Sequence, residues 1–512
     1  MKITLVNPPS LHLKYEPPLG LASLGAYLLR HNIDVKIIDA EALGLSHDQI
    51  QDELKRQAPD FVGVSVFTFN RFSAFKVAEI AKSLGAKVVV GGPHVSFTPR
   101  ETLAELAFID FVVIGEGELS LHNLLKAHQE NTPLGQVDGI AFRGKSAITV
   151  NKPQALIENL DDLPDPAWQL LPMEEYPFHA VMGARGCPNT CIFCASPFLW
   201  NKRLRFLSAD RFLNQMKQVL KDYGKKRVHF KDDTFTCHIK RAKYICEQIV
   251  KDDLNITWDC LARVHPIDED LLRLAQKAGC DKIRFGIEAG NEQIMKNIKK
   301  NITKEQVRHA VNTAKKLKFK SIGTLFMLGH PGETMRELEE TYQLCLELRV
   351  DHISFAPAMI FPGTELYEIA KINKMLPSNF SWNKTGYFQS GFDHITIDDV
   401  PLYSTKILPG RLLEQTSKRF YARSFFARAF DYNSVYDYRY LFETGLGVAF
   451  DAEENKGIIS ETFKNALKNQ PSIAKKLWGF ICLALYILKA PKVQRRHFFA
   501  FIGEVCKNGI KK

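Results

Sequence analysis

Residues 180–194 read AVMGARGCPNTCIFC, and this stretch decides the fold predicted for the middle of the chain. It opens with a short apolar segment, 180–184, typical of a β-strand, and continues into a loop with Cys187, Cys191 and Cys194. Three cysteines cannot all pair as disulfides, and thiolates at this spacing select an iron–sulfur cluster or zinc. A structural zinc site wants a fourth close Cys or His ligand, which this loop lacks, so the spacing favours a four-iron cluster with one open iron. Zinc and a coincidental spacing remain the alternatives.

Strand-like and helical segments alternate after this loop. The predicted strands are 180–184, 227–230, 256–261, 282–286, 322–327 and 352–355. Six βα units predict a partial (β/α)6 barrel of the TIM type, in which chemistry is performed at the carboxyl ends of the strands.

The first part of the chain shows a second α/β pattern. Its predicted strands are 3–6, 35–38, 61–66, 87–90 and 111–114, with helical segments such as 21–31 and 74–83 between them. Continuous apolar strands separated by helices predict a flavodoxin-like (Rossmann-type) parallel sheet covered on both faces. A hairpin around Gly144 and a Pro- and Asp-rich segment follow. We therefore predict four regions: an α/β domain at 1–135, a hairpin and linker at 136–178, the barrel at 179–377, and a mostly helical region at 378–512.

The cysteine loop resembles that of the radical S-adenosylmethionine (SAM) superfamily, since Phe193 also supplies the aromatic residue expected before the last cysteine. The resemblance implies a [4Fe–4S] cluster held by Cys187, Cys191 and Cys194, with SAM chelated to the open iron. One electron from the reduced cluster then cleaves SAM to a 5′-deoxyadenosyl radical, while the protein positions and shields the cofactor.

Further segments match the same family at successive strand ends. Taken singly, each has a structural explanation: Asp232 and Asp233 could cap a helix, and Arg263 could pair with an acid on the rim. Taken together and in order, they make coincidence improbable. The residues that the resemblance assigns to SAM binding are Asp232, Asp233, Arg263, Glu288, Gly329 and Pro331. No residue is assigned to the catalytic chemistry itself.

The amino-terminal domain resembles the cobalamin-binding domain that precedes many radical SAM domains. The loops that carry the resemblance follow predicted strands, at the edge where such sheets bind ligands. The residues implied to contact cobalamin are Asn7, Pro8, Gly91, Gly92, Pro93, Gly115 and Glu116. The D-x-H-x-x-G motif that supplies a cobalt-ligating histidine elsewhere is absent, and His94 is interpreted as a surface or packing residue or, alternatively, a cobalt ligand. No G-x-G-x-x-G follows the first strand, which argues against a nicotinamide dinucleotide.

The carboxyl-terminal region is basic. Residues 471–512 hold nine Lys or Arg and one acid, Glu504, and so carry +8 of the net charge of +11. The apolar run 477–488 is too short to span a bilayer, and it is either a buried helix or an interfacial helix with basic borders. The Arg- and aromatic-rich segment 418–430 is either an amphipathic helix packed on the barrel or a cover over the substrate. Nucleic acid is not an expected partner, because no reading motif accompanies these charges.

These patterns predict a cobalamin-dependent radical SAM C-methyltransferase. The expected partners are a small-molecule or lipid substrate and a reductant such as flavodoxin or ferredoxin. Seven scattered cysteines suit a reducing cytosol, so the predicted location is cytoplasmic. The basic carboxyl terminus is either a solvated end or a site of peripheral association with the inner face of the membrane or with a partner. The alternatives are an oxidative cyclase or rearrangement enzyme, as in the anaerobic magnesium-protoporphyrin ester cyclase group, and a non-catalytic cobalamin sensor, which needs no radical initiator. A methylthiotransferase is disfavoured, since no cysteine precedes Cys187.

Overall fold

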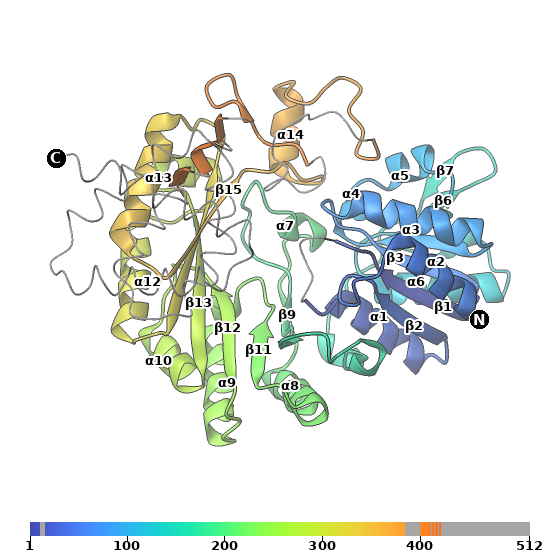
Figure 1. Cartoon of the computed structure of the whole chain (residues 1–512), viewed down its shortest axis with the longest axis horizontal. Coiled ribbons are helices and arrows are strands. Elements are labelled where there is room, and N and C mark those ends of the chain that lie inside the picture. The colour runs from blue at the N-terminus through green and yellow to red at the C-terminus, as the bar shows by residue number, and fades with distance from the viewer. Residues whose placement is uncertain (11–15, 385–399, 411, 414, 418, 421–512) are drawn as a thin grey trace, which may run out of the picture. The chain divides into compact units, whose positions relative to one another are not determined.

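The computed structural model describes residues 1–10, 16–384, 400–410, 412, 413, 415–417, 419 and 420 (Figure 1). These residues form two compact units. The first contains the described residues of 1–283 and 359–401, and the second contains those of 284–358 and 402–420.

The first unit begins with a seven-stranded sheet in the order β2-β1-β3-β4-β5-β6-β7. The first five strands pair in parallel in the flavodoxin order, which confirms the predicted fold. The strands are β1 (Lys2–Asn7), β2 (Asp34–Asp39), β3 (Phe61–Ser65), β4 (Lys87–Gly91), β5 (Phe111–Val113), β6 (Ile140–Arg143) and β7 (Ile148–Val150). The predicted hairpin is β6–β7, and it extends the sheet because β6 pairs antiparallel with β5.

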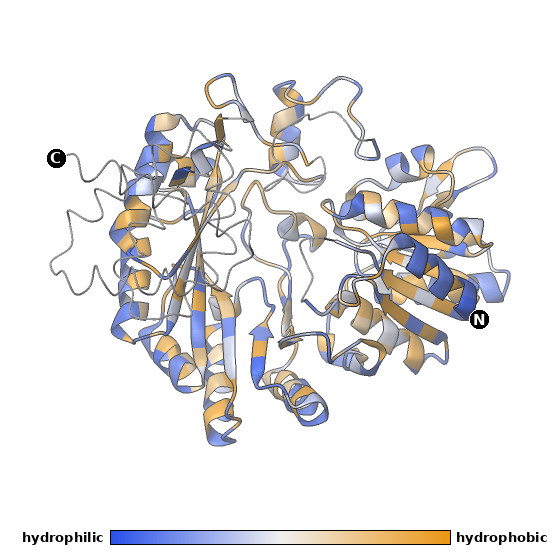
Figure 2. Ribbon diagram, in the orientation of Figure 1, coloured by the Kyte–Doolittle hydropathy of each residue, from blue (hydrophilic) through white to orange (hydrophobic). Residues whose placement is uncertain are grey.

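Helices cover both faces of this sheet (Figure 1). They are α1 (Leu19–Arg30), α2 (His47–Gln57), α3 (Arg71–Ser83), α4 (Pro93–Phe97), α5 (Pro99–Glu105) and α6 (Gly117–Gln129). Val88 and Val90 belong to the core with α2 and α3, whereas Val89 belongs to the opposite core with α1 and α6. This alternation is the two-residue period of a strand buried on both faces. Figure 2 shows the strands mostly in the hydrophobic colour and the helices striped, as this arrangement requires.

The predicted linker is anchored rather than loose. It contains two short 3₁₀ turns, η2 (Leu160–Asp162) and η3 (Trp168–Leu170), and a further turn, η1 (Leu134–Gln136), precedes the hairpin. The buried Tyr176 hydroxyl donates to Asp39 at the end of β2. The linker is thereby tied to the sheet edge on which the cobalamin prediction rests.

The second βα series forms a sheet whose order, β8-β11-β12-β13-β14-β15, follows the chain, as expected for a partial barrel. The strands are β8 (His179–Val181), β11 (Arg227–Phe230), β12 (Thr257–Ala262), β13 (Cys280–Glu288), β14 (Ser321–Leu328) and β15 (His352–Pro357). Two short strands, β9 (Ala184–Arg185) and β10 (Arg205–Phe206), pair antiparallel beside the cysteine loop. The predicted strand 180–184 is therefore split between β8 and β9, because the chain leaves the barrel sheet before the cysteines.

The helices of this series begin at residues with the expected capping chemistry. Ser208 caps α8, and Thr303 and Thr334 form capping boxes at the starts of α12 and α13. The helices are α7 (Ser196–Leu199), α8 (Ala209–Tyr223), α9 (Ile239–Lys251), α10 (Glu269–Lys277), α11 (Glu292–Asn297), α12 (Lys304–Lys316), α13 (Met335–Leu348) and α14 (Glu365–Ile372), and η4 (Phe235–Cys237) is a 3₁₀ turn. Phe230 of β11 stacks on Trp258 of β12 at 4.2 Å between ring centroids, which fixes the core behind these strand ends.

The tail predictions fall largely outside the described residues. Of the segment 418–430 only Arg419 and Phe420 are described, and the apolar run 477–488 is not described at all. Across the ranges that the structure does describe, no helix has the length and apolar character needed to cross a membrane. The predicted region boundaries at 135, 178 and 377 stay predictions.

Candidate functional site

The cysteine loop leaves β9 through a residue that must be glycine. Gly186 has a φ of +97°, and a Cβ at this position would lie 2.1 Å from the carbonyl oxygen of Arg203. The far end of the loop is held by the backbone N–H of Leu366, which donates to the carbonyl of Ile192 at 2.8 Å. The local sequence and a distant helix therefore shape the loop together.

The three thiols suit a cluster. Cys191 is buried, while Cys187 and Cys194 are half-buried, and none of the three forms a disulfide within the described residues. Burial, Asp233 and the other two cysteines together raise the pKa of Cys194 to about 12, so the thiols are close enough to act on one another. In the described part of the chain, no three His, Cys, Asp or Glu side chains are arranged to hold a single metal ion. A four-iron cluster binds each cysteine through its own iron, so it does not require such convergence.

Asp232 holds the cysteine loop in place. It follows β11, is buried, and its Oδ1 accepts the backbone N–H groups of Gly183 at 2.5 Å and Ala184 at 3.1 Å. Arg241 lies 3.8 Å from its Oδ2. Burial outweighs these partners and raises the pKa of Asp232 to about 6. This carboxylate supports the strand end that leads into the cysteines.

Two other predicted SAM residues of the first unit are more open. Asp233 is exposed and accepts a hydrogen bond from the hydroxyl of Ser196, two residues after Cys194. Arg263 is half-buried, directly after the last residue of β12. The structure brings Asp232 and Asp233 together with the cysteine loop, and it places Arg263 at the end of the strand next to theirs.

Glu288, Gly329 and Pro331 belong to the second unit. Glu288 ends β13 with a φ of +72°, and its buried carboxylate lies 2.9 Å from the Nζ of Lys300. Gly329 has a φ of +93° and follows β14, and Pro331 is half-buried two residues later. The carbonyl oxygen of Glu288 lies 3.4 Å from the Nε2 of His330, so these two predicted loops meet.

A buried carboxylate organises the turn that contains Gly329. Oε2 of Glu333 accepts the backbone N–H groups of Gly329 at 2.6 Å and His330 at 2.9 Å. Burial raises the pKa of Glu333 to about 7, despite these two hydrogen bonds. Sequence analysis missed Glu333, which lies two residues after Pro331, and Lys300, which lies twelve residues after Glu288.

The predicted cobalamin residues gather at the carboxyl edge of the parallel sheet. Asn7 ends β1 and donates to Asp39 at 2.8 Å, with Pro8 directly after it. Gly91, Gly92 and Pro93 connect β4 to α4, and a Cβ on Gly92 would lie 2.7 Å from the carbonyl oxygen of Val66. Because parallel strands end on the same edge, these loops meet where a flavodoxin-like sheet binds its ligand.

The turn after β5 completes this edge, and its acids already have partners. Gly115 has a φ of +77°, and its N–H donates to the hydroxyl of Ser96 at 3.0 Å. Glu116 accepts from Arg185 at 2.8 Å through Oε1, and from Arg205 at 2.8 Å and the N–H of Ile157 at 2.9 Å through Oε2. The acid predicted to contact cobalamin thus binds two arginines of the strands beside the cysteine loop.

His94 is packed inside the first unit. Its Nδ1 lies 3.1 Å from the hydroxyl of Thr68, and its ring meets Trp382 edge-on at 5.6 Å between centroids. Burial and the charge of Arg71 lower the pKa of His94 to about 3, so the ring is neutral. Its Nε2 is buried without a hydrogen-bond partner among the described residues.

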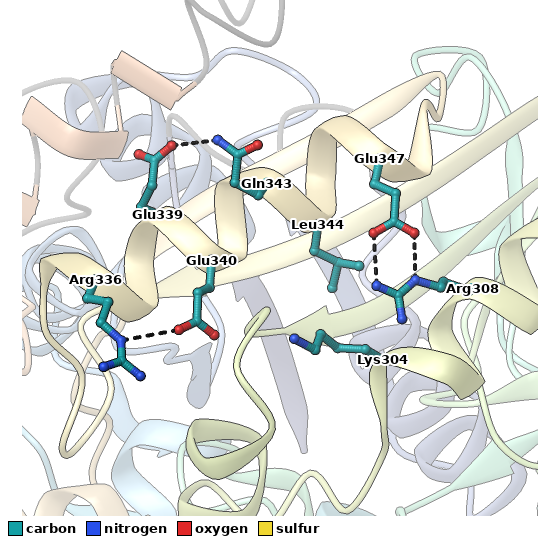
Figure 3. A pocket seen from close by; sticks show the side chains of 8 residues that line it. All are labelled: Lys304, Arg308, Arg336, Glu339, Glu340, Gln343, Leu344 and Glu347. Carbon is teal, nitrogen blue, oxygen red and sulfur yellow. Dashed lines mark hydrogen bonds and ion pairs between the residues drawn. The ribbon is translucent and has the colours of Figure 1, made fainter.

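The large surface groove of the second unit lies elsewhere. It has a volume of about 690 Å³, and charged side chains of α12 and α13 line it (Figure 3). Arg308 and Glu347 form two hydrogen bonds at 2.5 and 2.9 Å, and Arg336 faces Glu340 at 3.5 Å. Four of its charges thus form two pairs within the groove, and none of the predicted cofactor residues lines it.

The placement of Cys237 corrects a detail of the sequence interpretation. It was expected to be one of the scattered buried thiols, but it is half-buried in η4, in the loop that follows β11. Burial, Asp232 and Cys187 together raise the pKa of Cys237 to about 11, so it lies near the cysteine loop. Only the tertiary structure reveals this proximity.

Two family descriptions match the chain. The Radical SAM superfamily matches residues 181–345, and the B12 binding domain matches residues 13–125. The first match falls within the predicted barrel and the second within the predicted cobalamin-binding domain.

Curated relatives and a solved structure agree with these matches. The chain is 38% identical to an uncharacterized methyltransferase of Pyrococcus horikoshii, over 75% of this chain and 86% of the relative. It is 31% identical to the anaerobic magnesium-protoporphyrin IX monomethyl ester cyclase of Rubrivivax gelatinosus, over 69% of this chain and 66% of that protein. The fold is similar to that of the cobalamin-dependent SAM radical enzyme OxsB, with a TM-score of 0.71 and 18% identity, covering 99% of this chain and 84% of that one.

Proposed function

Because this chain belongs to the cobalamin-binding radical SAM enzymes, we propose that it methylates an unactivated carbon atom of a small-molecule or lipid substrate. Membership of this family implies three cofactors, which are SAM, a [4Fe–4S] cluster and cobalamin. The observation that carries the proposal is that the cysteine loop and the cobalamin-type sheet lie in one compact unit, where Arg185 of β9, two residues before Cys187, binds Glu116 and Glu118 after β5.

In this proposal the thiolates of Cys187, Cys191 and Cys194 bind three irons of the cluster. When bound, the cluster and cobalamin supply the electron and the methyl group, respectively. The protein's own residues position these cofactors and shield them from solvent. Asp232 holds the backbone ahead of the cysteines, and Gly186 allows the tight exit from β9.

The remaining assignments follow from the chemistry of each group. We assign Asp233, Arg263 and Glu288 to the polar groups of SAM, because carboxylates and a guanidinium can bind its amino, carboxylate and ribose groups. We assign Gly329 and Pro331 to the adenosine, because a residue without a Cβ allows a ligand to approach the backbone closely. The sheet edge that we assign to cobalamin is formed by Asn7, Pro8, Gly91, Gly92, Pro93, Gly115 and Glu116.

An oxidative cyclisation without methyl transfer is the second candidate. It is favoured by the 31% identity to the ester cyclase of Rubrivivax gelatinosus. A cobalamin sensor without catalysis is the weakest candidate, since the chain also carries the radical SAM region.

Methyl-labelled SAM separates the two enzymatic candidates. The reconstituted enzyme would be reduced with flavodoxin or ferredoxin, incubated with candidate lipids, tetrapyrroles and peptides, and its products weighed by mass spectrometry. A product that carries the labelled methyl group supports the proposal. A product that has lost hydrogen and gained no label selects the cyclase.

The finer parts of the proposal concern location and substrate. We propose a cytoplasmic enzyme that associates with anionic membranes through the basic residues around 477–488. This part rests on composition, because those residues lie outside the described part of the chain. A membrane-resident substrate would give such an association its purpose.

A further inference from the structure

Within the first unit, four buried charged side chains connect the parallel sheet to the strand pair beside the cysteine loop. Glu116 and Glu118 lie in the turn that follows β5 and opens α6. Arg185 donates to Glu116 at 2.8 Å and to Glu118 at 2.6 Å, and Arg205 donates to the other oxygen of Glu116 at 2.8 Å. We call these four residues the clamp.

The clamp is sealed from solvent. The exposed fractions of its members are 9% for Arg185, 5% for Arg205, 6% for Glu116 and 4% for Glu118. Burial alone would raise the pKa of Glu116, but Arg205 and Arg185 outweigh it and lower that pKa. Burial likewise opposes the charge of Arg185, but Glu118 and Glu116 outweigh it and raise the pKa of Arg185. The two guanidinium groups and the two carboxylates therefore stay charged inside the protein. Each charge depends on the opposite charges beside it to offset the cost of its removal from water.

The place of the clamp in the sequence gives it a possible role beyond stability. Arg185 is the last residue of β9, two positions before Cys187, and Arg205 is its partner in β10. Glu116 and Glu118 follow β5, at the carboxyl edge where a parallel α/β sheet binds its ligand. A change in the position of either loop is therefore transmitted to the other through two guanidinium groups.

We propose that Glu116, Glu118, Arg185 and Arg205 are positioning residues that couple cobalamin binding at the sheet edge to cluster binding at the cysteine loop. The inference rests on the proposed assignment of Cys187, Cys191 and Cys194 as cluster ligands. It adds that Glu116 acts through the arginines rather than by contact with cobalamin. Because coupling between two binding sites is reciprocal, a cluster that tightens cobalamin binding is itself bound more tightly, by the same factor, when cobalamin is present.

A matched control lies close by in the same unit. Arg203 and Glu158 form an equally short pair, at 2.6 and 2.7 Å, but their side chains are 53% and 64% exposed. Exposed pairs of this kind contribute little to stability. Glu158→Gln therefore removes an arginine–glutamate ion pair from the same unit and leaves the four residues of the clamp unchanged.

The test measures cobalamin affinity twice for each full-length protein, once with the cluster reconstituted and once after iron removal by a chelator. Absorbance titration with hydroxocobalamin gives both dissociation constants. We expect the cluster to tighten cobalamin binding at least about fivefold in the wild type and in Glu158→Gln. In Glu118→Gln the two constants should be nearly equal.

Glu118→Gln is the main variant because the Gln amide oxygen can still accept a hydrogen bond from Arg185, which also keeps its contact with Glu116. Circular dichroism and iron content check that the variant folds, and Arg185→Lys, which keeps the charge but loses the two-pronged contact, serves as a second variant. Two outcomes would overturn the proposal. One is a wild-type protein whose dissociation constant for cobalamin is the same with and without the cluster. The other is a ratio of these two constants that is as large in both clamp variants as in the wild type. If the cluster tightens cobalamin binding as expected but no methylated product is found, the role of the clamp is supported and the proposed function is rejected.

Discussion

The Nζ of Lys300 lies 2.9 Å from Oε1 of Glu288, and both side chains are buried. Glu288 ends β13 in the left-handed region, with a φ of +72°, which is strained for a residue with a side chain. Strain of this kind gathers at functional sites, where surrounding contacts hold it. Lys300 is such a contact, and it orients the carboxylate that we assign to SAM.

Lys300→Met should weaken SAM binding about tenfold and leave cluster iron unchanged, because a charge-assisted hydrogen bond to Glu288 is lost while the cysteines are untouched. Lys300→Arg should retain most of the affinity. Isothermal titration with SAM measures the effect, and Lys296→Met, at an exposed position of α11, is the control. Iron loss in parallel with SAM loss would show that Glu288 and Lys300 support the fold rather than the cosubstrate.

Changing Cys187, Cys191 or Cys194 to Ala should abolish or destabilise the iron–sulfur absorbance and stop SAM cleavage, since each thiolate holds one iron. Cys280→Ala, in the buried start of β13, should do neither. Cys237→Ala is the more demanding control because Cys237 lies near the loop, and it should also retain the cluster. Normal iron content in the triple variant would contradict the ligand assignment.

Asp232→Ala should lower the free energy of unfolding by about 2–4 kcal/mol, because it leaves two buried backbone N–H groups and the guanidinium of Arg241 without their acceptor. Asp232→Asn keeps an oxygen for the N–H groups of Gly183 and Ala184 and should cost less. Urea unfolding of the protein without cofactors measures both. If the two variants are equally stable, the carboxylate does not hold the loop.

His94 should make the first unit sensitive to acid. It stays neutral when folded, with a pKa of about 3, but titrates near 6.5 when unfolded. The stability it contributes is therefore complete above about pH 6.5 and is lost as the pH falls toward about 3. Between about pH 7.5 and pH 5, this residue alone should cost about 2 kcal/mol.

The measurement for His94 is urea unfolding of the wild type and of His94→Asn at both pH values. Asn keeps a polar group near the Thr68 hydroxyl but does not titrate in this range. The variant should lose less stability than the wild type on acidification. If the free energy of unfolding depends on pH identically in the two proteins, His94 does not contribute to the acid sensitivity.

The basic tail should bind anionic membranes in a salt-dependent way. Each Lys or Arg near such a surface contributes about 1 kcal/mol, and salt screens that attraction. The full-length protein should co-sediment with phosphatidylserine vesicles at low salt and be released at high salt, whereas a form that ends at Gln470 should stay in the supernatant. If the full-length protein ignores the vesicles at low salt, the run 477–488 is not an interfacial helix, and the case for a lipid substrate weakens.

Local patterns were sufficient to predict most elements of the fold. Strand β11 was predicted to the residue, because β-branched and aromatic side chains between turn signals form a short-range pattern. The cysteine loop, its position after a strand and the flavodoxin-like order of the first sheet were predictable for the same reason: spacing along the chain carries the information.

The partners of the charged residues were decided only by the tertiary structure. Sequence alone marked Glu116 as a cofactor contact, but the fold brings it to Arg185 and Arg205, which lie 69 and 89 residues away in the chain. Lys300 and Glu333 carry no local signal that tells a buried lysine or glutamate from an exposed one. A charge can remain buried only where an opposite charge or hydrogen-bond donors meet it, and which groups meet is set by the packing of distant strands rather than by the pattern along any one of them.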